Sequence, residues 1–143
     1  FLDVSAATGF DSLDNHFGMA TADLDGDGFL DIVTAGPGTT PALYMNQCGE
    51  GAWLEVELVG PRENSQAFGT QVEVDDGERV HLREVHGLRA TAQSPSRLHF
   101  GLGDLDIIPR VTIRWPGGET SEALDIGSRR VITVAHSNAI ERR

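Results

Sequence analysis

Hydrophobic and polar residues alternate along much of this chain, and turn-forming residues separate the alternating segments. Leu54, Val56 and Leu58 alternate with two glutamates, which predicts a strand with one buried and one solvated face. Residues 70–85 hold two such segments around Asp-Asp-Gly, a pattern that predicts a β-hairpin. Further strands are expected at 98–103, 111–115, 120–126 and 130–135, the last three as an antiparallel meander. Because no segment sustains apolar residues at helical spacing, we expect helices to be short or absent.

The composition agrees with many short strands. The chain has 143 residues, of which 39% are hydrophobic, with 17 Gly and 6 Pro, and this suits tight turns better than a helical bundle. The length fits one compact domain or a small domain with an appendage. We therefore predict an all-β fold in which an antiparallel β-sandwich or barrel-like domain follows an N-terminal β-hairpin.

The charge and the cysteine content limit which functions the protein can have. Lys plus Arg total 11 against 22 Asp plus Glu, so the net charge of −11 repels phosphates and makes nucleic acid an unexpected partner. No apolar stretch reaches membrane-spanning length. The single Cys48 excludes an internal disulfide, and we interpret it as a passive loop thiol. Because the chain begins at Phe1 rather than Met, we expect it to be a fragment or a mature piece.

The strongest local signal is the acidic segment 23–31, which places carboxylates at its first, third, fifth and ninth positions. Ca²⁺ takes about 6–8 oxygen ligands, and alternate side chains of a tightly curled loop can converge on one ion. Without a cation these carboxylates would repel one another. We predict a Ca²⁺ site between strands at 17–23 and 31–35, with these ligands: Asp23, Asp25, Asp27, Asp31 and the carbonyl of Phe29.

Other interpretations of this segment stay open. An EF-hand loop needs a bidentate Glu at its twelfth position, where this chain has Thr34, and it needs flanking helices that the sequence does not predict. Mg²⁺ is disfavoured because a ring of protein oxygens suits the larger ion, whereas Mn²⁺ could replace Ca²⁺ in vitro. The simplest alternative is an acidic Asp-Gly turn that binds no metal.

Two sets of motifs are similar to known families. The first set resembles an FG-GAP/VCBS repeat, a blade unit of integrin-type β-propellers, and consists of Phe1-Leu2-Asp3-Val4, Gly9, Gly18-Met19-Ala20, the 23–31 loop and Ile32-Val33. The second set resembles the ASPIC/UnbV domain of cartilage acidic protein-like proteins. Its motifs are Trp53-Leu54, Val56, Leu58 and Gly60, then Asn64, Ala67-Phe68-Gly69, Arg83-Glu84-Val85, residues 98–103, Trp115-Pro116 and Gly118.

The resemblance implies a calcium-binding β-repeat over residues 1–48, like part of a propeller blade, and an ASPIC/UnbV-like β-domain over 49–143. It implies a protein that is secreted, at the cell surface or periplasmic, with no established catalysis. One repeat cannot close a propeller ring, so either a longer protein precedes this chain or the lone blade packs on the domain that follows.

The remaining candidate residues favour an interaction module over an enzyme. His81, His86 and His99 could join a transition-metal or acid–base site only by folding from separate strands, and solvated or singly hydrogen-bonded histidines are the simpler interpretation. Trp53 and Trp115 could stack on sugars but are expected in the core. We predict a non-catalytic calcium-binding module for an unidentified protein or glycan. The alternative is an accessory or catalytic component of a natural-product pathway.

Overall fold

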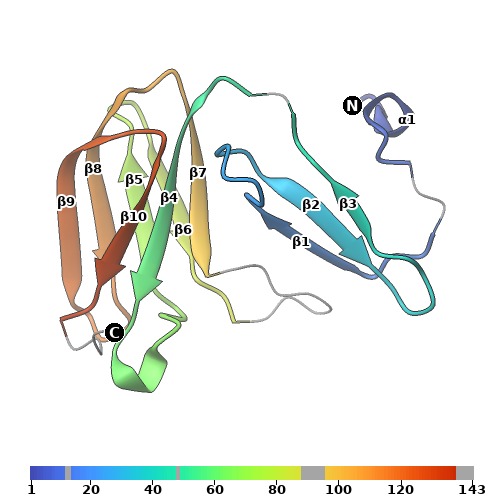
Figure 1. Cartoon of the computed structure of the whole chain (residues 1–143). Coiled ribbons are helices and arrows are strands. Elements are labelled where there is room, and N and C mark those ends of the chain that lie inside the picture. The colour runs from blue at the N-terminus through green and yellow to red at the C-terminus, as the bar shows by residue number, and fades with distance from the viewer. Residues whose placement is uncertain (12–13, 48, 88–95, 138–143) are drawn as a thin grey trace.

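The computed structural model describes residues 1–11, 14–47, 49–87 and 96–137, so Cys48 lies outside the described residues. The all-β prediction is confirmed, since 48% of the described residues lie in strands and 6% in helices, and these residues form no closed barrel. In the described parts of the chain the helices are α1 (Ser5–Thr8) and the 3-10 turn η1 (Arg62–Asn64), both as short as expected. Figure 1 shows a small sheet beside a larger β-sandwich.

The small sheet contains the predicted hairpin. Strands β1 (Gly18–Ala22) and β2 (Asp31–Ala35) pair antiparallel, as expected, around the acidic loop. A third strand, β3 (Ala42–Tyr44), which the sequence did not predict, pairs antiparallel with β2. The acidic loop therefore lies at one end of a three-stranded sheet with the order β1-β2-β3.

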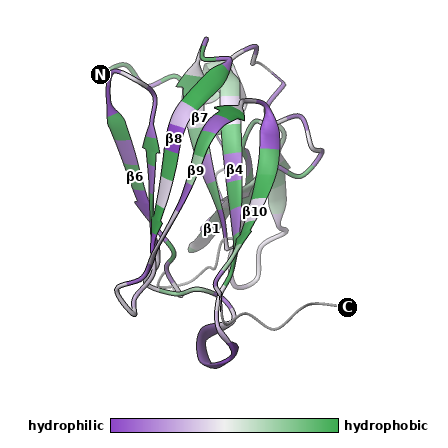
Figure 2. Ribbon diagram, turned by 90° about the vertical axis from the view of Figure 1, so that its left-hand side faces the viewer, coloured by the Kyte–Doolittle hydropathy of each residue, from purple (hydrophilic) through white to green (hydrophobic). Residues whose placement is uncertain are grey.

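The sandwich consists of two sheets with the strand orders β10-β4-β7 and β6-β5-β8-β9. Its strands are β4 (Ala52–Val59), β5 (Gln71–Asp75), β6 (Val80–Glu84), β7 (Arg97–Gly103), β8 (Ile107–Arg114), β9 (Thr120–Gly127) and β10 (Arg130–Ala135). The hairpin expected at 70–85 is present as β5 and β6. Figure 2 shows strands of the sandwich banded in hydrophobic and hydrophilic colours, as alternation between two faces requires.

The prediction of an antiparallel meander over 111–135 was wrong for its last strand. Strand β9 pairs antiparallel with β8, but β10 lies in the other sheet and runs parallel to β4, with Ile132 opposite Val56. Both Ile132 and Val134 still pack against the core. Alternation decides which side chains face inward but not which strand becomes the neighbour, and here the turn at 127–129 carries the chain from one sheet to the other.

The core lies between the two sheets of the sandwich. Leu54, Val56 and Phe100 from the first sheet are at most 1% exposed and meet inward residues of the second, such as Val111 and Ile113. Because successive side chains of a strand point to opposite faces, the remaining residues of β4 and β7 point away from the core. The outward side chains are Trp53, Glu55, Glu57, Arg97 and His99.

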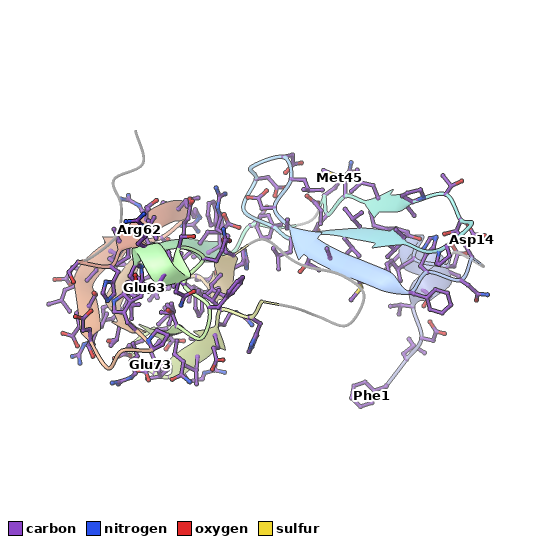
Figure 3. The ribbon with its side chains drawn as sticks, turned by 90° about the horizontal axis from the view of Figure 1, so that it is seen from below. Phe1, Asp14, Met45, Arg62, Glu63 and Glu73 are labelled. Atoms are coloured by element: carbon purple, nitrogen blue, oxygen red, sulfur yellow. The ribbon has the colours of Figure 1, made fainter. Side chains whose placement is uncertain are left out.

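The expected solvated face of β4 proved to be partly covered. Glu55 is only 4% exposed, because Arg97 on β7 pairs with it and because the small sheet lies next to this face. Viewed from below, the small sheet and the sandwich appear as two adjoining parts (Figure 3). The outward face of β4 and β7 is therefore where the two parts of the chain meet.

Candidate metal centre

The acidic loop curls around the carboxylate of Asp23. One oxygen of Asp23 accepts the Gly26 N–H at 2.7 Å and the other accepts the Gly28 N–H at 2.9 Å. Gly26 and Gly28 have φ angles of +82° and +90°, which residues with a Cβ adopt only with strain. The two glycines thus allow the tight curl that turns alternate side chains toward one point.

Two further carboxylates stabilise the same curl. Asp25 accepts the Asp27 N–H at 3.2 Å, and Asp27 accepts the Phe29 N–H at 2.8 Å. Each of these bonds spans two residues, as in Asx turns, so the sequence folds this way locally. Such bonds engage one lone pair of an oxygen, and an ionised carboxylate offers about four acceptor sites.

The loop brings three of the predicted ligands together. Asp23, Asp25 and Asp27 each offer a carboxylate oxygen, and these oxygens all lie within 4.8 Å of one another. Two oxygens on opposite sides of a Ca²⁺ ion would lie about 4.6–5.2 Å apart, given bonds of about 2.3–2.6 Å. The spacing and the hard oxygen donors therefore fit one such ion. Within the described ranges this is the one group of three or more acidic, His or Cys side chains close enough to share an ion.

Asp31 has a different environment from the other three aspartates. It begins β2, is 1% exposed, and accepts the Leu24 N–H at 2.9 Å and the Asn46 N–H at 2.8 Å. These bonds tie the start of the loop to the segment after β3. Asp31 is not in the group of three, and its role as a ligand, like that of the Phe29 carbonyl, stays a prediction.

The candidate histidines have separate partners. His81 contacts Asp76 at 2.7 Å, and this hydrogen bond, together with two backbone N–H groups, lowers the pKa of Asp76 from 3.8 to about 2. His86 lies 3.7 Å from Glu84, whereas the His99 ring contacts the Gly28 carbonyl at 2.8 Å. His99 faces away from Leu98 and Phe100, as expected. These contacts agree with histidines that are solvated, as His86 is, or singly hydrogen-bonded, as His81 and His99 are.

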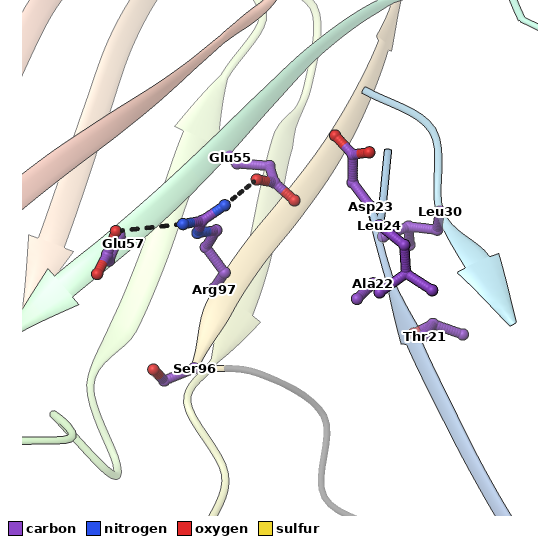
Figure 4. Close-up of a pocket in the computed structure, with 9 residues that line it drawn as sticks. All are labelled: Thr21, Ala22, Asp23, Leu24, Leu30, Glu55, Glu57, Ser96 and Arg97. Atoms are coloured by element: carbon purple, nitrogen blue, oxygen red, sulfur yellow. Dashed lines mark hydrogen bonds and ion pairs between the residues drawn. The ribbon is translucent and has the colours of Figure 1, made fainter. Parts of the chain in front are cut away.

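A cleft of about 350 Å³ separates the start of the acidic loop from the outward face of β4 and β7. Figure 4 shows Arg97 between two glutamates on one wall, with distances of 3.3 Å to Glu55 and 3.6 Å to Glu57. The other wall includes Asp23 and Leu24. Because Arg97 is engaged by the glutamates, the cleft keeps an excess of negative charge next to the loop.

The prediction of two core tryptophans was right for Trp115, which is 4% exposed, and wrong for Trp53. Trp53 is only half-buried and lies outside the core, on the face of the sheet that carries Glu55. Gly28 packs against its indole, and His99 stacks beside it. The alternation along β4 already indicated that Trp53 lies outside the core, because residue 53 shares a face with the two glutamates rather than with the leucines.

Comparison with protein families agrees with both sets of motifs. The FG-GAP repeat model matches residues 18–52 and the ASPIC and UnbV model matches residues 60–141. No curated protein matches the chain. FG-GAP repeats are typical of extracellular or surface-located proteins and typically bind calcium. The division at residues 48 and 49 stays a prediction.

Within the described residues, none of the helices is long and apolar enough to cross a membrane. The ASPIC and UnbV match covers more than half of the chain and includes strands of both sheets of the sandwich, while the FG-GAP match contains the whole acidic loop. The chain therefore belongs to the ASPIC and UnbV family, with an FG-GAP repeat before the family domain.

Proposed function

We propose that this protein is a calcium-binding, non-catalytic interaction module that works outside the cell, where free Ca²⁺ is available. The observation that carries the proposal is the convergence of the Asp23, Asp25 and Asp27 carboxylates within 4.8 Å. The geometry suits a hard divalent ion, and bringing three negative charges this close is unfavourable unless a cation offsets their repulsion. Calcium would stabilise the loop and so fix the β1–β2 hairpin.

In this proposal, residues of the acidic loop and the first residue of β2 hold the ion. The three clustered aspartates supply side-chain oxygens, and we propose Asp31 and the carbonyl of Phe29 as the remaining protein ligands. The position of Asp31 supports this assignment, because its side chain is buried beside the loop. The two hydrogen bonds that it accepts from backbone N–H groups leave lone pairs on both carboxylate oxygens. Mn²⁺ would bind to the same oxygen donors in vitro.

The non-catalytic part of the proposal follows from how the reactive side chains are used. The acidic residues of the loop serve the metal, and His81, His86 and His99 each contact a different partner. We propose that the surfaces around the loop and the sandwich bind a protein or a glycan. A binding screen against extracellular proteins and glycans, with and without EDTA, would identify the partner class and show whether binding depends on the metal.

Calcium binding is tested by thermal unfolding at increasing Ca²⁺. Free ion at a hundred times the dissociation constant should add about 2.7 kcal/mol to the free energy of unfolding. Asp25→Ala should remove most of this gain because the variant loses one of the three clustered oxygen donors. Asp104→Ala is the matched control, since it removes the same charge from an exposed turn outside the loop. A calcium-dependent shift that survives in Asp25→Ala would contradict the ligand assignment.

A further inference from the structure

Gly28 is the point where the acidic loop contacts the sandwich. It is buried, although residues 24–27 before it are exposed. A Cβ built on Gly28 would lie 1.8 Å from Nε1 and 2.0 Å from Cε2 of Trp53, so the indole lies directly against the glycine backbone. No side chain fits in this space, and the glycine is required both by its φ of +90° and by the close approach.

His99 makes the second contact with the same residue. Its Nε2 lies 2.8 Å from the Gly28 carbonyl oxygen. A carbonyl only accepts hydrogen bonds, so Nε2 carries the hydrogen and donates it. The imidazole lies beside the indole of Trp53, with ring centroids 6.4 Å apart and an interplanar angle of 14°. Trp53 and His99 thus form a platform, which we call the aromatic platform, on the outward face of β4 and β7.

Gly28 joins this platform to a predicted metal ligand. Its carbonyl accepts from His99, and its N–H donates to Asp23 at 2.9 Å. The Asp23 carboxylate is therefore held by a residue whose own position is fixed by the sandwich. A shift of the loop away from the platform would move Gly28 and would release the hydrogen bond that orients Asp23.

We propose that Trp53 and His99 are positioning residues of the calcium site, so that the sandwich holds the acidic loop in its metal-binding conformation. This inference rests on the proposed calcium binding. Holding the loop in place before the ion arrives lowers the entropy lost on binding and so raises the affinity. By linkage, bound calcium strengthens the contact between the two parts of the chain by the same factor.

The first test measures calcium affinity by isothermal titration in the whole chain. His99→Ala removes a single hydrogen bond to the loop and should weaken calcium binding by about two- to tenfold. His99→Gln keeps an N–H donor and should restore most of the affinity. His86→Ala is the matched control, because His86 is exposed and pairs with Glu84 rather than with the loop. Equal affinity in wild type and His99→Ala would overturn the inference.

A spectroscopic test needs no variant. The chain has two tryptophans, so a ¹⁵N-labelled sample should give two indole N–H resonances. Trp53 Nε1 lies at Gly28, whereas Trp115 is buried in the core and its Nε1 donates to Ser121 Oγ at 3.0 Å. Calcium should shift the Trp53 resonance and leave the Trp115 resonance in place. A general change in stability would not single out Trp53.

The possible outcomes separate this inference from the proposed function. If calcium does not bind to the wild-type chain in the titration, the proposed function fails, and the coupling fails with it. If calcium binds while the Trp53 indole resonance stays fixed, the proposed function stands and the positioning role is refuted. If the His99→Ala variant does not fold, the indole resonances of the wild-type chain still decide the question.

Discussion

Replacing Gly28 with alanine adds one methyl group to the acidic loop. This change should weaken the contact between the acidic loop and the sandwich more than a methyl group added at any other position of the loop. The new Cβ would lie 1.8 Å from Trp53 Nε1, well inside van der Waals contact, so the loop or the indole must move. Overpacking of this kind costs about 1–3 kcal/mol. The φ of +90° adds about 1 kcal/mol of backbone strain for a residue with a Cβ. The expected loss is about 2–4 kcal/mol.

Gly26→Ala separates the two contributions. Gly26 has a similar φ of +82°, but a Cβ there would meet nothing within 4 Å. This variant should lose only the strain, about 1 kcal/mol. Denaturant unfolding of both variants and the wild type, followed by circular dichroism and tryptophan fluorescence, measures the difference, which we expect to be about 1–3 kcal/mol. Equal losses in the two variants would show that the contact between Gly28 and Trp53 does not stabilise the protein.

Two further predictions concern charged pairs. The pKa of Asp76 lies at about 2, chiefly through its hydrogen bond to His81, so the stabilisation is present above pH 3.8 and is lost as the pH falls through about 2. Asp76→Asn should remove this part of the acid transition, and an unchanged acid transition would contradict the assignment. Arg97→Ala leaves the buried Glu55 carboxylate without its cation and should cost about 1–3 kcal/mol in denaturant unfolding. Arg114→Ala breaks an exposed pair and should cost less than about 1 kcal/mol, so equal losses would refute this reasoning.

The acidic loop and most strands could be predicted from the sequence because the interactions that define them are local. The three clustered aspartates lie within five consecutive residues, and hydrogen bonds that span two to five residues shape their loop. The alternation of Leu54, Val56 and Leu58 correctly gave the buried face of β4. Such patterns act over one strand or one turn, so a local sequence contains all of the required information.

Only the tertiary structure decided how these elements meet. Strand β10 pairs with β4 across more than 70 residues of sequence, and no local pattern selects that partner over β9. The burial of Glu55 depends on Arg97 and on the small sheet, which lie far from it in the chain. The place of Trp53 against Gly28, beside His99, likewise joins three distant segments. Periodicity assigns a side chain to a face, but the free energy of packing between distant segments determines what covers that face.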